Sequence, residues 1–174
     1  MKNVQEARFT RADYMLLPEG FRAELIDGVL VKEPAPTGWH QRLVREILLE
    51  TVACLGRERA IQSPIDVFVD EHNVLQPDVA VLPEDAPIRR GAVEIAMPVL
   101  VVEVLSPSTA RRDRLVKTRT YLRAGVREVW LVDPDTRCAE IVTTAGTRLF
   151  AAGSVPRSGA VPGFALDLGA LFAG

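Results

Sequence analysis

Hydrophobic and polar positions along the chain change their period several times, and each change predicts an element. Between residues 39 and 59, apolar side chains recur at steps of three and four, which predicts an amphipathic helix ending near Gly56. Later runs rich in valine, isoleucine and leucine predict strands. These runs are residues 65–69, 79–82, 99–105 and 129–132. Two of them hardly alternate, which is typical of strands covered on both faces, so the pattern predicts an α/β fold.

Shorter segments complete the predicted order of elements. Asp27-Gly28 lies between two short apolar runs, and both residues tolerate the positive φ of a tight turn, so residues 23–31 are predicted to form a hairpin. Residues 108–124 are predicted to form a helix, because Ser108 and Thr109 can cap it and Gly125 can end it. The remaining predicted elements are a helix over 10–17, a hairpin formed by 138–143 and 148–151, and a helix over 170–172.

Composition excludes some classes of protein without changing the predicted fold. The chain has 174 residues, of which 48% are hydrophobic and 25% charged, and it has no low-complexity linker, so one domain spanning 1–174 is expected. A formal net charge of -2 gives no overall basic surface, so nucleic-acid binding would need a local patch. We expect no membrane segment, because no apolar run approaches the about 18 residues that such a span needs.

Cysteine usage predicts the cellular compartment. Cys54 and Cys138 lie far apart in apolar patterns and have no zinc-ligand spacing, so we expect both to be reduced, buried thiols. The N-terminus lacks the basic and then apolar pattern of a signal segment. Both observations favour a cytoplasmic protein.

Two carboxylates within apolar runs are the strongest chemical signal in the sequence. Asp78 follows Pro77 at the start of one predicted strand, and Glu103 lies among valines in another. An unpaired buried carboxylate is costly, and two close carboxylates resist joint ionisation unless a cation lies between them. Oxygen ligands favour Mg²⁺ or Mn²⁺, whereas no cluster of histidine or cysteine suits zinc. The alternative is an ion pair between Glu103 and an arginine of the following helix.

Lys117 lies on the predicted helix 108–124, among residues expected to face the sheet. A lysine there could orient or deprotonate an attacking water, or stabilise charge on a phosphate. The ordinary alternative is an i,i+4 ion pair with Asp113. Arginines of the same helix could contact backbone phosphates, or they could simply form a solvated face. These arginines are Arg112, Arg119 and Arg123.

Four motifs, in this order, resemble the Uma family of restriction-endonuclease-like proteins. They are Glu24-Leu25-Ile26-Asp27-Gly28, Gln76-Pro77-Asp78-Val79-Ala80, Val102-Glu103-Val104-Leu105-Ser106-Pro107-Ser108-Thr109 and Trp130-Leu131-Val132-Asp133-Pro134. The resemblance covers about residues 10–172. It implies the PD-(D/E)XK signature and a restriction-endonuclease-like core in the order α-β-β-β-α-β around a mixed central sheet, here with a β-hairpin added at each end.

The resemblance implies a role for each matching residue. Pro77-Asp78 matches the PD element, and Glu103 matches the second acid. The lysine of the signature would fall at Leu105, and the family implies that Lys117 from the next helix replaces it. Glu24 would be a further acid lining the cleft, or else an ion pair at a strand end.

His40 begins the long predicted helix, where its side chain and free backbone N–H groups could meet a phosphate. A helix cap or an exposed histidine is equally compatible with this position. We therefore include His40 among the candidates for nucleic-acid binding.

The implied activity is that of a Mg²⁺-dependent endodeoxyribonuclease. Asp78, Glu103 and the backbone carbonyl of Val104 would hold Mg²⁺ (or Mn²⁺), and DNA is the expected substrate by analogy alone. Two alternatives stay open: a catalytically inactive nucleic-acid-binding or protein-interaction module on the same fold, and a hydrolase of another phosphate ester. If exposed, Leu115 and Leu122 would suggest a homodimer.

Overall fold

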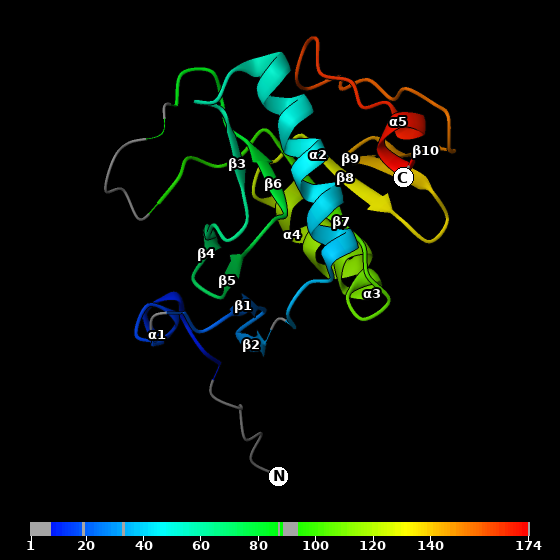
Figure 1. Cartoon of the computed structure of the whole chain (residues 1–174). Helices are drawn as coiled ribbons and strands as arrows, with labels where there is room; N and C mark the ends of the chain where they lie inside the picture. The colour runs from blue at the N-terminus through cyan, green and yellow to red at the C-terminus, as the bar shows by residue number, and fades with distance from the viewer. Residues whose placement is uncertain (1–7, 19, 33, 87, 89–93, 174) are drawn as a thin grey trace.

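Two β-sheets form the frame of the protein, shown in Figure 1 as a computed structural model that describes residues 8–18, 20–32, 34–86, 88 and 94–173. The small sheet has the order β2-β1-β5-β4, and the central sheet has the order β10-β9-β8-β7-β6-β3. Strands of the small sheet are β1 (Ala23–Ile26), β2 (Val29–Lys32), β4 (Val67–Asp70) and β5 (Asn73–Leu75). Strands of the central sheet are β3 (Ala60–Gln62), β6 (Val79–Val81), β7 (Leu100–Val104), β8 (Glu128–Asp133), β9 (Cys138–Thr143) and β10 (Gly146–Phe150).

The central sheet is mixed, because β7 and β8 run parallel while its other neighbouring strands are antiparallel. Its helical partners are α2 (Gly38–Leu55) and the series α3 (Ala110–Arg112), η1 (Asp113–Lys117) and α4 (Thr118–Arg123). The described part of the chain also contains α1 (Arg11–Tyr14) and α5 (Leu168–Phe172). The predicted α/β class with a mixed sheet and a hairpin near each end is confirmed.

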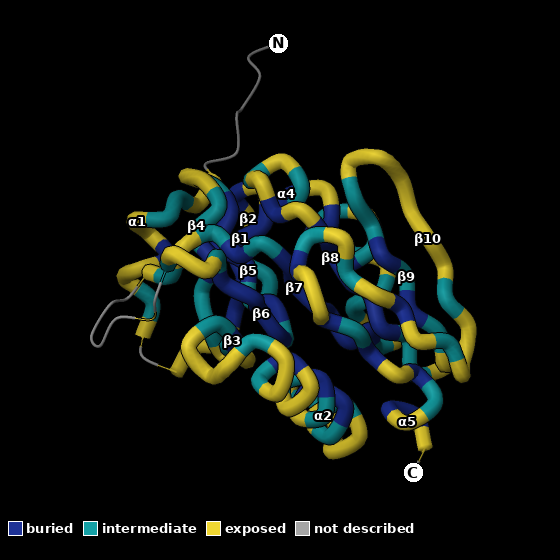
Figure 2. The backbone as a smooth tube through the Cα atoms, turned by 90° about the horizontal axis from the view of Figure 1, so that it is seen from above, coloured by how far each residue is buried: buried dark blue, intermediate teal, exposed yellow. Residues whose placement is uncertain are grey.

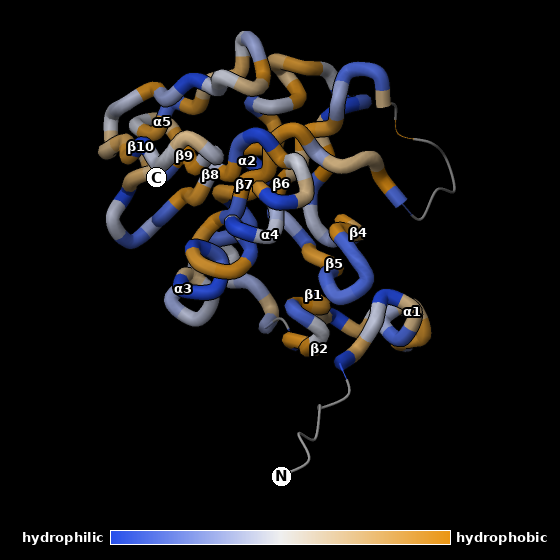
Figure 3. Tube along the Cα trace, turned by 180° about the vertical axis from the view of Figure 1, so that it is seen from behind, coloured by the Kyte–Doolittle hydropathy of each residue, from blue (hydrophilic) through white to orange (hydrophobic). Residues whose placement is uncertain are grey.

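Strand β7 is covered on both faces, which explains its continuous run of apolar residues. Val102 and Val104 pack in the core cluster that contains residues of α2, whereas Val101 packs with Tyr121 of α4 in the second cluster. Figure 2 shows α2 and α4 on opposite sides of the central strands, and Figure 3 shows how hydrophobic those strands are. Because side chains alternate along a strand, Glu103 points to the same face as Val101, toward α4.

Local sequence determines where the predicted elements begin and end. Helix α2 begins after Thr37, whose Oγ1 accepts from the backbone N–H of His40, and it ends at Gly56 with a φ of 81°. In the predicted hairpin, Asp27 and Gly28 both have positive φ, 49° and 78°. Helix α1 is shorter than predicted, and β3 and β5 were missed, because three residues each are too few to display a period.

The predicted helix 108–124 is helical but not uniformly α-helical. Its middle, η1, is a π-helical turn, and Thr118 Oγ1 donates to the carbonyl oxygen of Asp113 over 2.7 Å across that turn. A π-turn inserts one residue into the helix and shifts the direction of all side chains that follow. Such turns are frequent at functional sites, and hydrophobic periodicity does not predict them.

The predicted burial of the cysteines is wrong for Cys54 and only partly met by Cys138. Both cysteines are free thiols, but Cys54 is exposed and Cys138 is half-buried. Among the described residues, no helix combines the length and the apolar character needed to cross a bilayer.

A buried glutamate fixes the C-terminal segment to the central sheet. Glu128, only 3% exposed, accepts from Trp130 Nε1 at 2.9 Å and from Ser158 Oγ at 2.7 Å. It also accepts from the backbone N–H groups of Gly159 at 2.7 Å and Ala160 at 3.1 Å. The carboxylate therefore replaces water for four donors at the edge of the core.

Candidate active site

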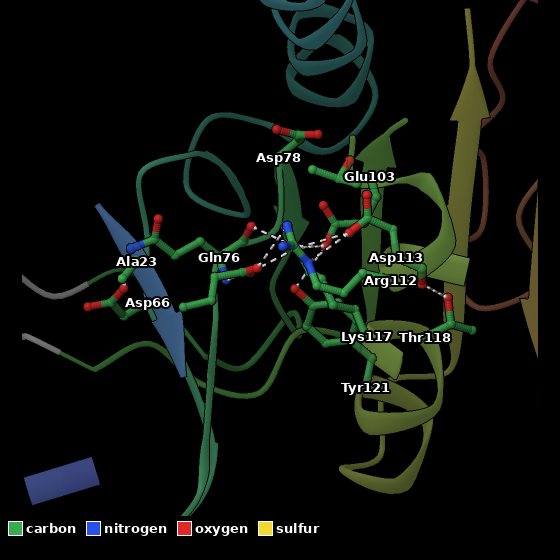
Figure 4. A network of polar contacts seen from close by, with 12 residues as sticks. Ala23, Asp66, Gln76, Asp78, Glu103, Arg112, Asp113, Lys117, Thr118 and Tyr121 are labelled. Carbon is green, nitrogen blue, oxygen red and sulfur yellow. Dashed lines mark hydrogen bonds and ion pairs between the residues drawn. The ribbon is translucent and has the colours of Figure 1, made fainter. Parts of the chain in front are cut away.

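Lys117 connects carboxylates from the two sheets. Its Nζ lies 2.8 Å from Glu24 Oε1 of β1. It also lies 2.8 Å from Glu103 Oε1 of β7, and Figure 4 shows Lys117 and Glu103 directed toward each other. Their exposed fractions are 4% for Lys117, 1% for Glu24 and 3% for Glu103. The lysine therefore compensates both buried charges, as the cost of burying a lone carboxylate requires.

Three side chains of the helical series, Asp113, Lys117 and Tyr121, meet at this point. Asp113 Oδ1 lies 3.8 Å from Lys117 Nζ, and Tyr121 Oη donates to Glu103 Oε1 over 3.0 Å. The expected alternative, an i,i+4 pair between Lys117 and Asp113, is therefore present, but it is longer than the contacts that Lys117 makes with Glu24 and Glu103.

Glu24 and Lys117 also hold the backbone that leads to Asp78. The backbone N–H of Gln76 donates to Glu24 Oε1 over 2.6 Å, and its carbonyl oxygen lies 3.4 Å from Lys117 Nζ. Glu24 Oε2 is buried and has no hydrogen bond within the described residues, although Arg112 Nη2 lies 3.9 Å away. Glu24 thus helps to position both Lys117 and the backbone that precedes Asp78.

Asp78 lies beside the carbonyl of Val104 and the ring of His40. The backbone N–H of Val104 donates to Asp78 Oδ2 over 2.8 Å. His40 Nε2 lies 3.2 Å from Asp78 Oδ2 and 3.0 Å from the carbonyl oxygen of Val104. His40 occupies the first turn of α2, so the Thr37 cap that starts the helix also positions this ring.

The charges of the cluster change its proton affinities. Burial raises the pKa of Glu103 well above its ordinary value; the Lys117 ammonium opposes that shift, and the Asp113 and Asp78 carboxylates add to it. Burial lowers the pKa of Lys117, but the nearby carboxylates, Glu103 first, outweigh it and raise that pKa well above its ordinary value. The raised pKa favours the ammonium form of Lys117, which can donate to a water or to a phosphate oxygen.

His40 keeps its proton more tightly than an ordinary histidine. Burial lowers its pKa, but the hydrogen bond and charge of Asp78, together with the Val104 carbonyl, raise the pKa above the usual value. An N–H at Nε2 can then donate toward both oxygens.

One cavity of about 330 Å³ collects most of the predicted site. This volume lies in the range of small-molecule and cofactor pockets. Its lining includes Asp78, Glu103, Val104, Lys117, His40, Arg112 and Asp113. Arg119 and Arg123 line a separate hollow with Leu115 and Leu122, so the three predicted arginines do not form one surface.

The predicted metal ligands fit a divalent cation in donor chemistry. Asp78 Oδ2 and the Val104 carbonyl oxygen both lie close to His40 Nε2, so these two oxygens converge on one small region. Within the described residues, no group of three histidine, cysteine, aspartate or glutamate side chains could hold a metal by itself. The Val104 carbonyl is therefore essential to the predicted set, and oxygen donors of this kind suit Mg²⁺ or Mn²⁺.

Sequence reasoning did not assign Gln76, Asp113 or Tyr121 to the site. Asp113 and Tyr121 stand four residues before and after Lys117, so a helix places all three on one side. Gln76 directly precedes Pro77-Asp78, where the backbone must be fixed for the acid to be aimed. These spacings were a signal available in the sequence.

Comparisons with known proteins assign the chain to a family. The sequence pattern of the Uma2 family, described as "Putative restriction endonuclease", matches residues 11–169. A solved structure from Anabaena variabilis ATCC 29413, described as a "putative nuclease belonging to DUF820", superposes with a TM-score of 0.82. It is 21% identical, and the match covers 95% of this chain and 98% of that one, so it shows a shared fold. Among curated proteins, none matches the chain.

The family match spans the four motifs that carry the resemblance, from Glu24 to Pro134. The predicted resemblance is thereby confirmed. The chain belongs to the Uma2 family.

Proposed function

We propose that the protein is a metal-dependent endonuclease that hydrolyses phosphodiester bonds in DNA. The observation that carries this proposal is a single cavity in which Glu103, paired with protonated Lys117, lies beside Asp78 and the Val104 carbonyl. Membership of a family described as restriction endonucleases supports hydrolysis of nucleic acid, and the nuclease of the same fold agrees with it.

The proposed reaction assigns a part to Asp78, Glu103, Val104 and Lys117, which line the cavity. Asp78, Glu103 and the Val104 carbonyl would hold Mg²⁺ or Mn²⁺, and such an ion lowers the pKa of a bound water and offsets phosphate charge. Lys117 remains an ammonium group, held between Glu24 and Glu103, and donates to the attacking water or to a phosphate oxygen.

Substrate binding involves the rim of the same cavity. Arg112 lines the cavity, and its planar guanidinium group suits a phosphate. Arg119 and Arg123 lie on another flank of the helix, where they would contact a longer stretch of backbone.

A homodimer suits cleavage of both strands of a duplex. Leu115 is 53% exposed, and with the half-buried Leu122 it lines an open hollow on η1 and α4. A dimer contact at this hollow would cover Arg119 and Arg123, so it is the alternative to their contact with DNA. We place the protein in the cytoplasm, where its free thiols stay reduced.

A catalytically inactive binding module on the same fold is the second candidate function. The observation in its favour is the pairing of Lys117, whose ammonium group contacts two carboxylates at 2.8 Å and is almost fully buried. A purely structural ion cluster would have the same geometry.

A nuclease assay separates the two functions. Single-stranded, duplex and structured DNA and RNA are incubated with Mg²⁺, Mn²⁺ or a chelator. We expect metal-dependent internal cleavage of DNA by the wild type and loss of at least a hundredfold in rate in Asp78→Ala and Glu103→Ala. Asp135→Ala, which changes an exposed acid outside the cavity, serves as the matched control. Cleavage that survives the loss of both site acids contradicts the proposal, and binding without cleavage supports the module.

A further inference from the structure

The position of His40 has a consequence for the metal centre. Its Nε2 atom lies 3.2 Å from Asp78 Oδ2 and 3.0 Å from the Val104 carbonyl oxygen. These are two of the oxygens expected to bind the ion, and the imidazole nitrogen joins them as a third donor atom in the same small region.

The spacing of these atoms matches that of neighbouring ligands around one octahedral ion. Ligands held at about 2.1 Å and at right angles are about 3.0 Å apart, which follows from octahedral geometry. A single N–H group, by contrast, cannot point straight at two acceptors, so one of the two contacts is a poorly aligned hydrogen bond. The 3.0 Å contact with the Val104 carbonyl is a hydrogen bond, and both distances also match the spacing of neighbouring ligands, so a bound ion would take the place of the Nε2 proton between these atoms.

The orientation of the ring depends on Nε2. The other ring nitrogen, Nδ1, is buried and has no hydrogen-bond partner within the described residues. The N-terminus of α2 positions the backbone through the Thr37 cap, and the Nε2 contacts then orient the ring toward Asp78 and Val104. A histidine side chain that is 17% exposed and aimed at two metal-binding oxygens has the placement of a ligand.

We propose that His40 is itself a ligand of the ion through Nε2, so that it joins Asp78, Glu103 and the Val104 carbonyl in a mixed nitrogen and oxygen site. This assignment rests on the proposed metal-dependent function and changes the role of His40 from phosphate contact to metal binding. Imidazole favours transition metals, and affinities rise from Mn²⁺ to Co²⁺ and Ni²⁺. The site therefore binds Mn²⁺ and Co²⁺ more tightly than Mg²⁺.

Metal titration by calorimetry tests the assignment without relying on activity. Mn²⁺, Co²⁺ and Mg²⁺ are titrated into the wild type, His40→Ala and His40→Gln. The chain has two histidines, so His72→Ala is a matched control, since His72 lies in a turn where its Nδ1 contacts the Phe9 carbonyl. We expect His40→Ala to weaken Mn²⁺ and Co²⁺ binding by at least tenfold, because even residues behind the ligands contribute about 10–100-fold.

His40→Gln sharpens the test because it offers an amide oxygen in place of the nitrogen. We expect this variant to retain Mg²⁺ binding better than Co²⁺ binding, which reduces the selectivity of the site. Equal or tighter Mn²⁺ binding by His40→Ala overturns the proposal, because the imidazole would then only occupy the place of the ion.

A second measurement on the wild type needs no variant to fold. In protein labelled with ¹⁵N at histidine, addition of diamagnetic Zn²⁺ is expected to move the Nε2 resonance of His40 and leave both nitrogens of His72 unchanged. An unmoved His40 resonance at saturating Zn²⁺ overturns the assignment.

These results separate failure of the ligand from failure of the nuclease. Metal-dependent cleavage with unchanged Mn²⁺ affinity in His40→Ala overturns the role of His40 alone. Loss of Mn²⁺ affinity in that variant without cleavage of any substrate by the wild type supports the ligand and overturns the nuclease. No Mn²⁺ binding by the wild type overturns both.

Discussion

Replacing Lys117 with methionine leaves Glu24 and Glu103 buried without the ammonium group that both contact. In the wild type each lies 2.8 Å from Lys117 Nζ, and both are almost inaccessible to water. Removing one partner of a buried ion pair costs about 3–5 kcal/mol. Against a total stability of about 5–15 kcal/mol, this loss lowers Tm by about 6–20 °C.

The stability that Lys117→Met loses depends on pH, and the pKa of Glu103 sets the direction of this dependence. Burial raises the pKa of Glu103, and Lys117 opposes that shift, so Lys117→Met raises the pKa further. A carboxyl with a raised pKa binds its proton more tightly in the folded state than in the unfolded state. Its contribution to stability is therefore present below the ordinary value of 4.5 and is lost as pH rises through the folded pKa. We expect Lys117→Met to be closest to the wild type in acid and to lose stability steadily toward neutral pH.

Urea unfolding followed by circular dichroism between pH 5 and pH 8 measures this effect. Lys32→Met removes an exposed lysine and should stay within about 0.5 kcal/mol of the wild type. Adding Glu103→Gln to Lys117→Met should recover part of the lost stability, because it removes a charge that no cation compensates. A Lys117→Met protein as stable as the wild type at neutral pH, or one whose deficit does not change with pH, would refute the reasoning.

Three further changes test separate parts of the structure. Glu128→Ala deprives Trp130 Nε1 and nearby backbone N–H groups of their acceptor, at about 1–3 kcal/mol for a buried donor, so thermal unfolding should show a lower Tm and no change in metal affinity. Tyr121→Phe removes the hydrogen bond to Glu103 and should lower kcat more than it changes KM in cleavage kinetics; an unchanged kcat contradicts a positioning role. Leu115→Ser should convert the proposed dimer to a monomer in light scattering while the fold, measured by circular dichroism, is retained.

Periodicity predicted the elements that are long or have a specific turn. Helix α2 spans 18 residues, and its apolar stripe repeats often enough to be recognised, while Asp27-Gly28 specifies its turn through backbone conformation. Strands β3 and β5 have three residues each and carry no repeat. β3 pairs with β6, and β5 pairs with the adjacent β4 and with the more distant β1. Cys54 was expected inside because its neighbours are apolar, but it lies on the solvent-facing side of α2.

The cost of burying charge predicted the centre of the site better than its periphery. A carboxylate buried in an apolar strand, such as that of Glu103, is costly without a partner. Lys117, on the sheet-facing side of a helix, is that partner. The contact between His40 and the Val104 carbonyl was not predictable, because α2 and β7 meet only in the folded chain. The ligand roles of Asp78 and Glu103 stay predictions until a metal is measured.

Leu105 stands where the PD-(D/E)XK signature has a lysine, and the structure of the following helix shows where this chain has one instead. Leu105 is 3% exposed and packs with Tyr121 and Leu131 in an apolar cluster, so a lysine at that position would bury its charge among hydrocarbons. Lys117, the last residue of the π-turn, instead contacts Glu103 from the helix that covers this face of β7. From the helix, the ammonium group of Lys117 also contacts Glu24 in the small sheet. Lys117 thus joins the two sheets, and with its proposed role in the site its removal should cost stability and activity together.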